Sequence, residues 1–215
     1  MIHVINQTNS IFSTYLSEIR DVVIQKDPMR FRRNLERMAE IIGYEISKKL
    51  TYQPVSVITP LGIADSVTLT QQLVLATILR AGLPMHNGLL AIFDRAENAF
   101  VSAYRKHSTA EEFDIHVEYM AAPGITGKTL IISDPMLATG RSMYLVYKAL
   151  LQQGNPSHVH IVAAIAAPEA LEYLKQLLPE NVTIWVGAID RELTAQSYIV
   201  PGLGDAGDLA FGIKC

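Results

Sequence analysis

The feature that most constrains the fold is the alternation of short apolar runs with helical segments between residues 73 and 190. Apolar runs of this length, bounded by turn residues, are typical of strands buried in a parallel sheet. The chain is therefore predicted to be an α/β protein with a mostly parallel sheet flanked by helices. The expected strands are 73–79, 99–104, 115–120, 129–133, 158–166 and 182–189, and the expected helices between them are 85–93, 142–153 and 168–178.

Both ends of the chain differ from this core. Residues 10–26 and 31–49 have helical spacing, with Asp27-Pro28 between them, and predict two N-terminal helices. Residues 54–59 and 63–69 are β-rich around Pro60-Leu61-Gly62, which indicates a projecting β-hairpin arm, an element that often serves dimer contacts. Glycine and proline punctuate residues 198–212 so densely that we expect a shaped loop there.

Length and composition favour one domain. The chain has 215 residues, 49% of them hydrophobic and 18% charged, enough for one sizeable core. Within that domain we expect N-terminal helices at 1–50, the arm at 54–69, the α/β core at 73–190, and a C-terminal loop segment at 191–215. A net charge of −3 gives no broad attraction to nucleic acid or anionic membrane. The only cysteine is Cys215, and we identify no signal peptide or membrane segment, so a cytoplasmic protein is expected.

Residues 133–142 are the most informative stretch. An acidic residue, Asp134, ends an expected buried strand, and a loop of small residues opens the next helix. Ligands of open α/β sheets lie at the carboxyl ends of strands, and helix N-termini attract anions. A phosphate is expected here, with Asp134 available to sugar hydroxyls or to the outer shell of a magnesium ion. An ordinary Asp-Pro turn before a capped helix fits the same pattern, and both readings are open at this point.

Four segments occur in the order and spacing of one known family. They are Asp-Pro-Met-Leu-Ala-Thr-Gly at 134–140, Ile-Leu-Arg-Ala-Gly-Leu at 78–83, Tyr-Arg at 104–105, and Tyr-Ile-Val-Pro-Gly-Leu-Gly-Asp-Ala-Gly-Asp at 198–208. Together they resemble the uracil branch of the phosphoribosyltransferase family. The resemblance implies a parallel sheet with a hood over the active site, and magnesium-dependent transfer of the phosphoribosyl group of 5-phosphoribosyl 1-diphosphate (PRPP) to uracil. It also implies a homodimer or larger homo-oligomer and, in some relatives, activation by GTP.

The same resemblance assigns the candidate PRPP-binding residues. It places Arg80 and Arg105 on the pyrophosphate, where guanidinium groups suit a leaving group whose charge grows. Taken singly, each arginine is more often a surface ion-pair partner. No protein metal ligand is expected, because magnesium would arrive mainly with PRPP. The resemblance places the ribose 5-phosphate and its hydroxyls on Asp134, Pro135, Met136, Leu137, Ala138, Thr139, Gly140, Arg141 and Ser142.

The base is assigned to the tail. The resemblance places Ile199, Gly204, Asp205 and Ala206 on uracil, with Asp205 also reaching PRPP. The candidate catalytic residues are Arg80, Arg105, Asp134 and Asp205.

Two positions depart from the family pattern. Arg141 stands where many relatives carry a second glycine, and we expect its amide, more than its side chain, to serve the phosphate. Residues 52–74 resemble the family only loosely.

Three other signals favour a structural interpretation. Gly127-Lys128-Thr129 suggests a nucleotide P-loop but leads into an expected strand. His158 and His160 share a strand face but lack a third metal ligand at a telling spacing. A basic cluster interleaved with glutamates is more typical of a solvated helix face than of an RNA or effector site. Its members are Arg30, Arg32, Arg33 and Arg37.

Two further function classes compete with a transferase. One is an RNA-binding regulator that uses this fold as a nucleotide sensor, which needs a broad basic face. The other is a binding module that has lost catalysis, in which we would expect a missing pyrophosphate arginine or a broken base loop. Neither feature is seen in the sequence.

Overall fold

A mostly parallel sheet forms the centre of the protein in the computed structural model, which describes residues 1–107 and 113–214, without the side chains of 103–107 and 113–117. The strand order is β1-β10-β9-β7-β4-β5-β6, with β8 beside β9, and the antiparallel pair is β5 with β6. The predicted α/β fold is confirmed. The strands are β1 (Ile2–Val4), β4 (Leu73–Leu79), β5 (Glu97–His107), β6 (Phe113–Ala121), β7 (Thr129–Ser133), β8 (Met136–Leu137), β9 (His158–Ala166) and β10 (Val182–Ile189).

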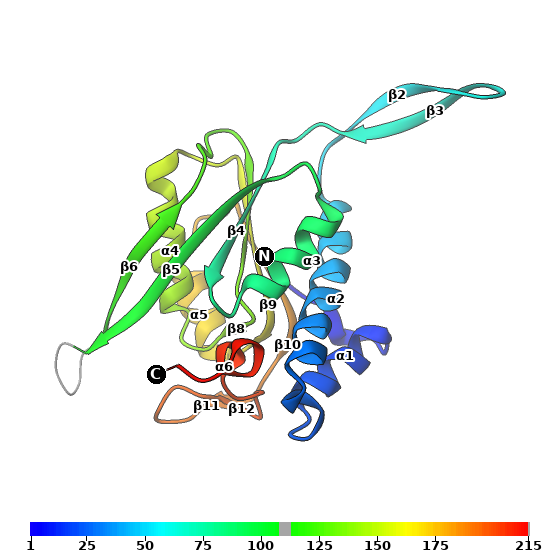
Figure 1. Cartoon of the computed structure of the whole chain (residues 1–215). Helices are drawn as coiled ribbons and strands as arrows, with labels where there is room; N and C mark the ends of the chain where they lie inside the picture. Colours follow the sequence, from blue (N-terminus) through cyan, green and yellow to red (C-terminus); the bar gives the residue numbers. More distant parts are fainter. Residues whose placement is uncertain (108–112, 215) are drawn as a thin grey trace.

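Helices cover both faces of this sheet (Figure 1). One apolar core joins the sheet to α1 (Ile11–Arg20), α2 (Pro28–Ser47) and α3 (Leu83–Ile92). A second core, on the other face, joins it to α4 (Arg141–Leu150) and α5 (Pro168–Leu177). The central strands β4, β7 and β9 are buried along most of their length, which explains why their sequences are almost continuously apolar.

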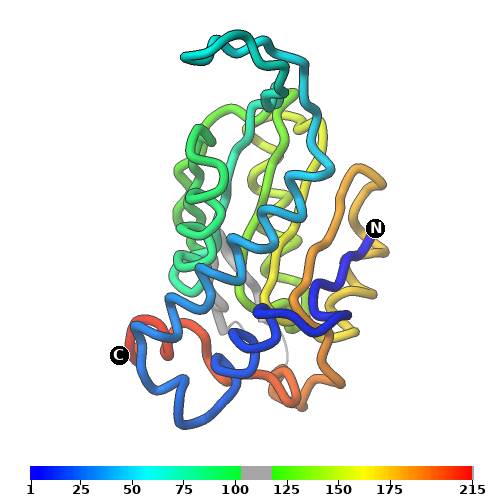
Figure 2. Tube along the Cα trace, turned by 90° about the vertical axis from the view of Figure 1, so that its right-hand side faces the viewer, coloured from blue at the N-terminus to red at the C-terminus, as the bar shows by residue number. Residues whose placement is uncertain are grey.

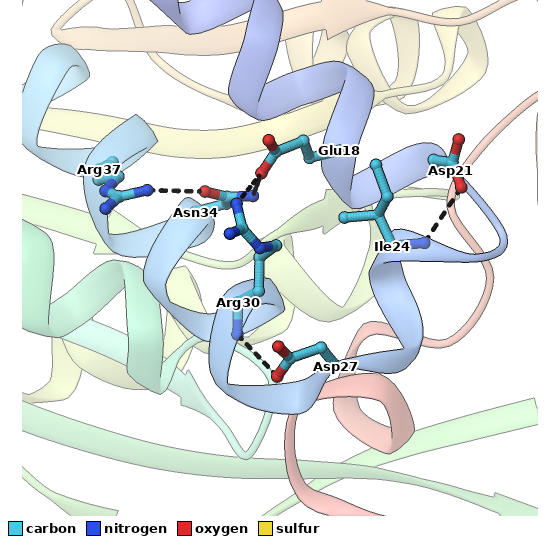
Figure 3. A network of polar contacts seen from close by, with 7 residues as sticks. All are labelled: Glu18, Asp21, Ile24, Asp27, Arg30, Asn34 and Arg37. Atoms are coloured by element: carbon cyan, nitrogen blue, oxygen red, sulfur yellow. Dashed lines mark hydrogen bonds and ion pairs between the residues drawn. The ribbon is translucent and has the colours of Figure 1, made fainter.

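The first helix is shorter than the sequence predicted. Helical spacing suggested residues 10–26, but α1 ends at Arg20 and a separate 3₁₀ turn follows at Ile24–Lys26. The cause is Asp21, whose carboxylate accepts the Val23 amide at 2.8 Å and the Ile24 amide at 3.1 Å, the second of which is drawn in Figure 3. A side chain that takes backbone amides offers the chain an alternative to continuing the helix.

The start of α2 follows its sequence signals. Asp27 accepts the amides of Met29 and Arg30, and Pro28 occupies the first turn, where its missing N–H costs nothing. Figure 3 shows Glu18 of α1 accepting from both Arg30 and Asn34 of α2, at 3.1 and 2.7 Å, so these two helices are fastened at their junction.

The expected hairpin arm is present. Strands β2 (Tyr52–Thr59) and β3 (Gly62–Leu69) form a separate antiparallel pair that projects from the body (Figures 1 and 2). Its apolar side chains face outward, with Ile58 88% exposed and Ile63 76% exposed.

The prediction that residues 198–212 form only a loop was wrong. This stretch contains β12 (Ile199–Val200), which pairs with β11 (Glu192–Leu193), and a short helix, α6 (Ala206–Phe211). The helix forms because the Asp205 carboxylate caps it by accepting the Asp208 amide at 3.0 Å. Glycine density therefore overstated the irregular part of the tail.

The sequence analysis did not predict β1. It has three residues, too few for a periodic signal, and exists because Ile2, His3 and Val4 pair in parallel with β10. The His3 ring stacks on Trp185 with centroids 4.2 Å apart.

The P-loop and histidine signals are structural, as the sequence suggested. Lys128 pairs with Glu97, and residues 127–129 run into β7 instead of a helix. The rings of His158 and His160 lie 4.6 Å apart, and His160 Nδ1 accepts from the Trp185 indole at 3.0 Å. Burial lowers the pKa of His160 to about 3, so this packing imidazole is neutral.

The basic cluster is not uniformly solvated, which corrects the sequence expectation. Arg30 and Arg33 make exposed ion pairs. Arg32 instead donates to the Ala210 carbonyl at 2.6 Å and lies over the Phe211 ring, because α6 packs against α2.

Within residues 1–107 and 113–214, no helix is both long enough and apolar enough to cross a membrane.

Candidate active site

The predicted site segments meet at one edge of the sheet. Strand β4 leads into Arg80, β7 into Asp134 and β10 into Asp190, and these strands run in parallel. Their carboxyl ends therefore share an edge, where ligands of such sheets bind. The tail that carries α6 and the β11–β12 pair lies across this edge (Figure 1).

Two adjoining hollows occupy this edge. The smaller, about 160 Å³, is lined by the loop from Asp134 to Gly140 and the first residues of α4. The larger, about 530 Å³, shares Met136, Ala138 and Ser142 with the first. Its other wall is the tail, including Ile199, Gly204 and Asp205. Segments more than fifty residues apart in sequence thus line one continuous space.

The loop between β7 and α4 presents backbone amides. Its short strand β8 pairs with β9, and Gly140 takes a left-handed conformation with φ 76° immediately before the helix. Gly140 provides no side-chain cap, and the Arg141 amide makes only a long contact of 3.4 Å with the Thr139 hydroxyl, so the first amides of α4 are suited to an anion. The Arg141 side chain is exposed at this turn.

Asp134 has a strongly perturbed carboxyl group. Its amide donates to the Val162 carbonyl at 3.1 Å, which fixes the residue at the end of β7. Burial raises the pKa of Asp134 to about 7, although a hydrogen bond from the Met136 amide acts in the opposite direction. Near neutral pH this carboxyl group can gain or lose a proton, an attribute common in functional sites.

The loop after β4 packs closely against the ends of β4 and β7. A Cβ at Gly82 would lie 2.2 Å from the Thr77 hydroxyl and 2.9 Å from the Ser133 carbonyl, so no side chain fits. The Leu79–Arg80 peptide bond in this loop is cis.

Arg80 reaches the tail. Its Nη2 donates to Asp208 Oδ1 at 2.8 Å and to the Gly212 carbonyl at 2.9 Å. The loop after β4 and the segment around α6 are thus joined.

Only the backbone position of Arg105 is described. It lies on β5 opposite Ile115 of β6, three residues beyond Ser102, which pairs with Leu79 of β4. The Arg105 side chain lies outside the described residues.

The tail loop has a fixed, irregular backbone. The Val200–Pro201 bond is cis, and Gly202 and Gly204 have φ of 61° and 92°, which only glycine adopts readily. Asp205 faces the larger hollow while its carboxylate caps α6.

Sequence comparison decides the family. The family profile described as "Uracil phosphoribosyltransferase" matches residues 6–213. The chain belongs to the uracil phosphoribosyltransferase family. The uracil phosphoribosyltransferase of Porphyromonas gingivalis is 58% identical over 206 residues, which are 96% of this chain and 95% of that protein. That of Pyrococcus furiosus is 39% identical over 200 residues, 92% and 84% of the two chains.

Solved structures agree with the family fold. The AQ2163 protein from Aquifex aeolicus superposes with a TM-score of 0.88 at 30% identity, over 99% of both chains. A hypoxanthine phosphoribosyltransferase from Staphylococcus aureus reaches a TM-score of 0.53 at 14% identity, over 87% of this chain and 84% of that one, a likeness of fold alone. The predicted phosphoribosyltransferase fold is confirmed.

Several residues around this uracil phosphoribosyltransferase site were missed by sequence reasoning. Asp190 follows β10 as Asp134 follows β7, so its place at a strand end was a usable signal. The other hollow-lining residues are in the tail. Tyr198 and Leu203 lie in the segment 198–208 that resembles the family's base loop, although neither was assigned to substrate. Gln196, Ser197 and Lys214 carry no such signal, because only the fold brings them there.

Proposed function

We propose that this protein transfers the phosphoribosyl group of PRPP to uracil, giving uridine monophosphate and diphosphate, a reaction of pyrimidine salvage. The reaction follows from membership of the uracil phosphoribosyltransferase family. We place the active site at the hollow of about 530 Å³ because the loop after β7 and the tail both line it. A sugar phosphate on one wall and a flat base on the other would meet within it.

The 5-phosphate fits the start of α4. Backbone amides at a helix N-terminus, together with its dipole, bind phosphate without a charged side chain, so an exposed Arg141 is compatible with this role. Asp134, at the end of β7, would accept hydrogen bonds from the ribose hydroxyls when ionised.

The diphosphate is assigned to Arg80 and Arg105. Negative charge grows on this group as its bond to the anomeric carbon breaks, and guanidinium donors stabilise it increasingly along the reaction. The Nη2 of Arg80 donates to Asp208 and Gly212, so diphosphate would have to use its other guanidinium N–H groups.

The residues fit a magnesium ion that arrives with PRPP. Magnesium in phosphate sites commonly takes one or two carboxylates and the oxygens of the substrate, and Asp134 and Asp205 face the paired hollows. Among the described residues, no three His, Cys, Asp or Glu side chains gather into a metal site of their own. The ion would supply charge neutralisation to the diphosphate.

The base is assigned to backbone groups of the tail. A carbonyl at Ile199 or Gly204 would accept the uracil N3–H, and the Ala206 amide would donate to a carbonyl oxygen of uracil. Asp205, beside them on the same wall, faces the PRPP side. Backbone groups in a turn with left-handed glycines keep one donor and acceptor pattern.

Product formation tests the proposal. The purified protein is incubated with uracil, PRPP and magnesium, and uridine monophosphate is measured by chromatography. We expect uracil-dependent and PRPP-dependent product. A protein that binds PRPP without forming product would instead be a binding module, and the proposed reaction would be wrong.

We also propose a homodimer or larger homo-oligomer that uses the arm. The support is the exposed apolar surface of β2 and β3, of which Leu61 is fully exposed. A GTP effector and a cytoplasmic location, expected from the sequence, stay predictions.

A further inference from the structure

Arg20 and Asp190 form a buried ion pair beside the tail loop, and neither residue is assigned to substrate. Arg20, the last residue of α1, donates through Nη2 to Asp190 Oδ1 at 2.5 Å and through Nη1 to Asp190 Oδ2 at 2.9 Å. The Asp190 side chain is 4% exposed and that of Arg20 is 21% exposed. The two groups thus form a two-pronged pair largely withdrawn from water, a geometry specific to arginine.

This pair holds both backbone groups of one tail residue. The Gly202 amide donates to Asp190 Oδ2 at 2.9 Å, and the Gly202 carbonyl accepts from Arg20 Nη1 at 3.1 Å. The loop is therefore fixed in position and in peptide orientation at Gly202. Neither Arg20 nor Asp190 lines the substrate hollow, so they act on it only through this contact.

Gly202 lies directly against a residue assigned to the base. A Cβ on Gly202 would be 2.2 Å from the Ile199 carbonyl oxygen, so the Gly202 backbone occupies the space beside that carbonyl. The Arg191 amide also donates to the Val200 carbonyl at 2.9 Å, next to the Asp190–Gly202 contact. A shift of Gly202 would thus move the Ile199 carbonyl.

Other hydrogen bonds hold both members of the pair in place. Asp190 is fixed because its amide donates to the Ala166 carbonyl at 2.8 Å at the end of the sheet. On the helix side, the buried Gln25 donates to the Arg20 carbonyl at 3.0 Å. The Asp21 turn after Arg20 and the contacts of Glu18 with α2 fasten this corner (Figure 3).

We propose that Arg20 and Asp190 are positioning residues for the base, which set the affinity for uracil by holding Gly202 and, through it, the Ile199 carbonyl. The inference rests on the proposed assignment of uracil to the tail. It makes the N-terminal helix part of the base site although no residue of α1 touches the substrate hollow. Because the phosphate loop is on the opposite wall and makes no hydrogen bond with the pair, PRPP binding depends on the pair much less than uracil binding does.

Steady-state kinetics of Arg20→Lys and Asp190→Asn test the inference. Lysine keeps the charge but loses the two-pronged contact, and asparagine keeps the shape but loses the charge. For each variant we expect the KM for uracil to rise about tenfold or more. The KM for PRPP should stay within about twofold, and kcat within about threefold. The double variant should have a KM for uracil no higher than that of the poorer single variant, because each substitution breaks the same Arg20–Asp190 pair.

Chemical rescue separates positioning from general destabilisation. In Arg20→Ala, millimolar guanidinium chloride should restore the affinity for uracil while leaving wild-type kinetics unchanged. If Arg20→Ala does not fold, Arg20→Lys decides the matter from its KM values. The matched control is Arg30→Lys, which alters an exposed pair with Glu18 at the same helix junction and should leave both KM values unchanged.

Two results would overturn the inference. One is a folded Arg20→Lys or Asp190→Asn protein whose KM for uracil equals that of the wild type. The other is an equal rise in both KM values, which would show general damage to the site. Failure of the proposed function is distinguishable, because the wild-type protein would then form no uridine monophosphate at all.

Discussion

Asp134 combines a strand-end position with a carboxyl group whose pKa burial raises to about 7. The raised pKa affects folding and ligand binding in opposite directions. The protonated form stabilises the folded chain, a contribution that is complete below the unfolded pKa near 3.8 and is lost as pH rises through about 7. The ionised form is the one that accepts ribose hydroxyls and favours a magnesium-bearing ligand.

The affinity for PRPP should therefore increase as pH rises from 6 to 8. Below pH 7 each unit of acidification should weaken binding by up to about tenfold through this group, because binding must first remove its proton. Calorimetry in buffers of different ionisation enthalpy should detect the proton released. Asp134→Asn should bind PRPP more weakly and lose this part of the pH dependence. An identical pH profile in both proteins would contradict the role of Asp134.

Arg80→Ala and Arg105→Ala should each lower turnover by on the order of a hundredfold or more, because each removes charge stabilisation that strengthens as diphosphate leaves. Both variants should still fold, and Arg80→Ala should melt somewhat lower than the wild type, because it also loses the contacts to Asp208 and Gly212. Arg33→Ala, which removes an exposed ion pair on α2, is the control and should keep full activity. Wild-type turnover in either site variant would remove that arginine from the diphosphate site.

Among elements, the loop after β4 depends on the absence of a side chain at Gly82. A methyl group there would meet the Thr77 hydroxyl and the backbone oxygens of Ile78 and Ser133 at 2.9 Å or less. Gly82→Ala should therefore displace the loop, cost about 1 to 3 kcal/mol of stability, and raise the KM for PRPP. Gly124→Ala is the control, since its nearest atom would be 3.9 Å away. Equal melting temperatures and KM values for both variants would show that the loop tolerates the methyl group.

The sequence predicted elements well where burial alone determines them. Strands β4, β7, β9 and β10 match the apolar runs residue for residue, because both faces of each are covered. It failed where one polar side chain decides the local backbone, as at Asp21, which ends α1, and Asp205, which starts α6.

The same contrast applies to the site. The candidates at 134–142 were recognisable because the pattern of strand, small-residue loop and helix is local. Asp190 offered only its place after a strand, and Arg20 offered no local signal, because their pairing joins positions 170 residues apart and exists only in the folded chain.

For the whole molecule, the arm exposes apolar side chains to water, which is unfavourable in an isolated chain. Ile58 and Ile63 are 88% and 76% exposed on the projecting hairpin. Sedimentation should therefore show a dimer or larger assembly, and Ile58→Ser combined with Ile63→Ser should shift it toward monomer. Val22→Ser combined with Val23→Ser removes apolar side chains of similar exposure from the body and should not. A monomeric wild-type protein would contradict the assembly.

The central claim is that fixed backbone groups of the tail select uracil in a hollow shared with the phosphate loop. The decisive measurement is a competition assay with PRPP, magnesium and equal concentrations of uracil and other bases. Cytosine lacks the N3 proton and carries a donor where uracil carries an acceptor. Two mispaired groups at about 1 to 3 kcal/mol each predict a preference for uracil of roughly thirtyfold to ten-thousandfold or more.

Uracil and small analogues such as 5-fluorouracil should be consumed in that assay. Thymine should be disfavoured, because its methyl group would crowd the tail or Met136, which line the same hollow. Adenine and hypoxanthine should remain unreacted. Consumption of cytosine or a purine as fast as uracil would contradict the account.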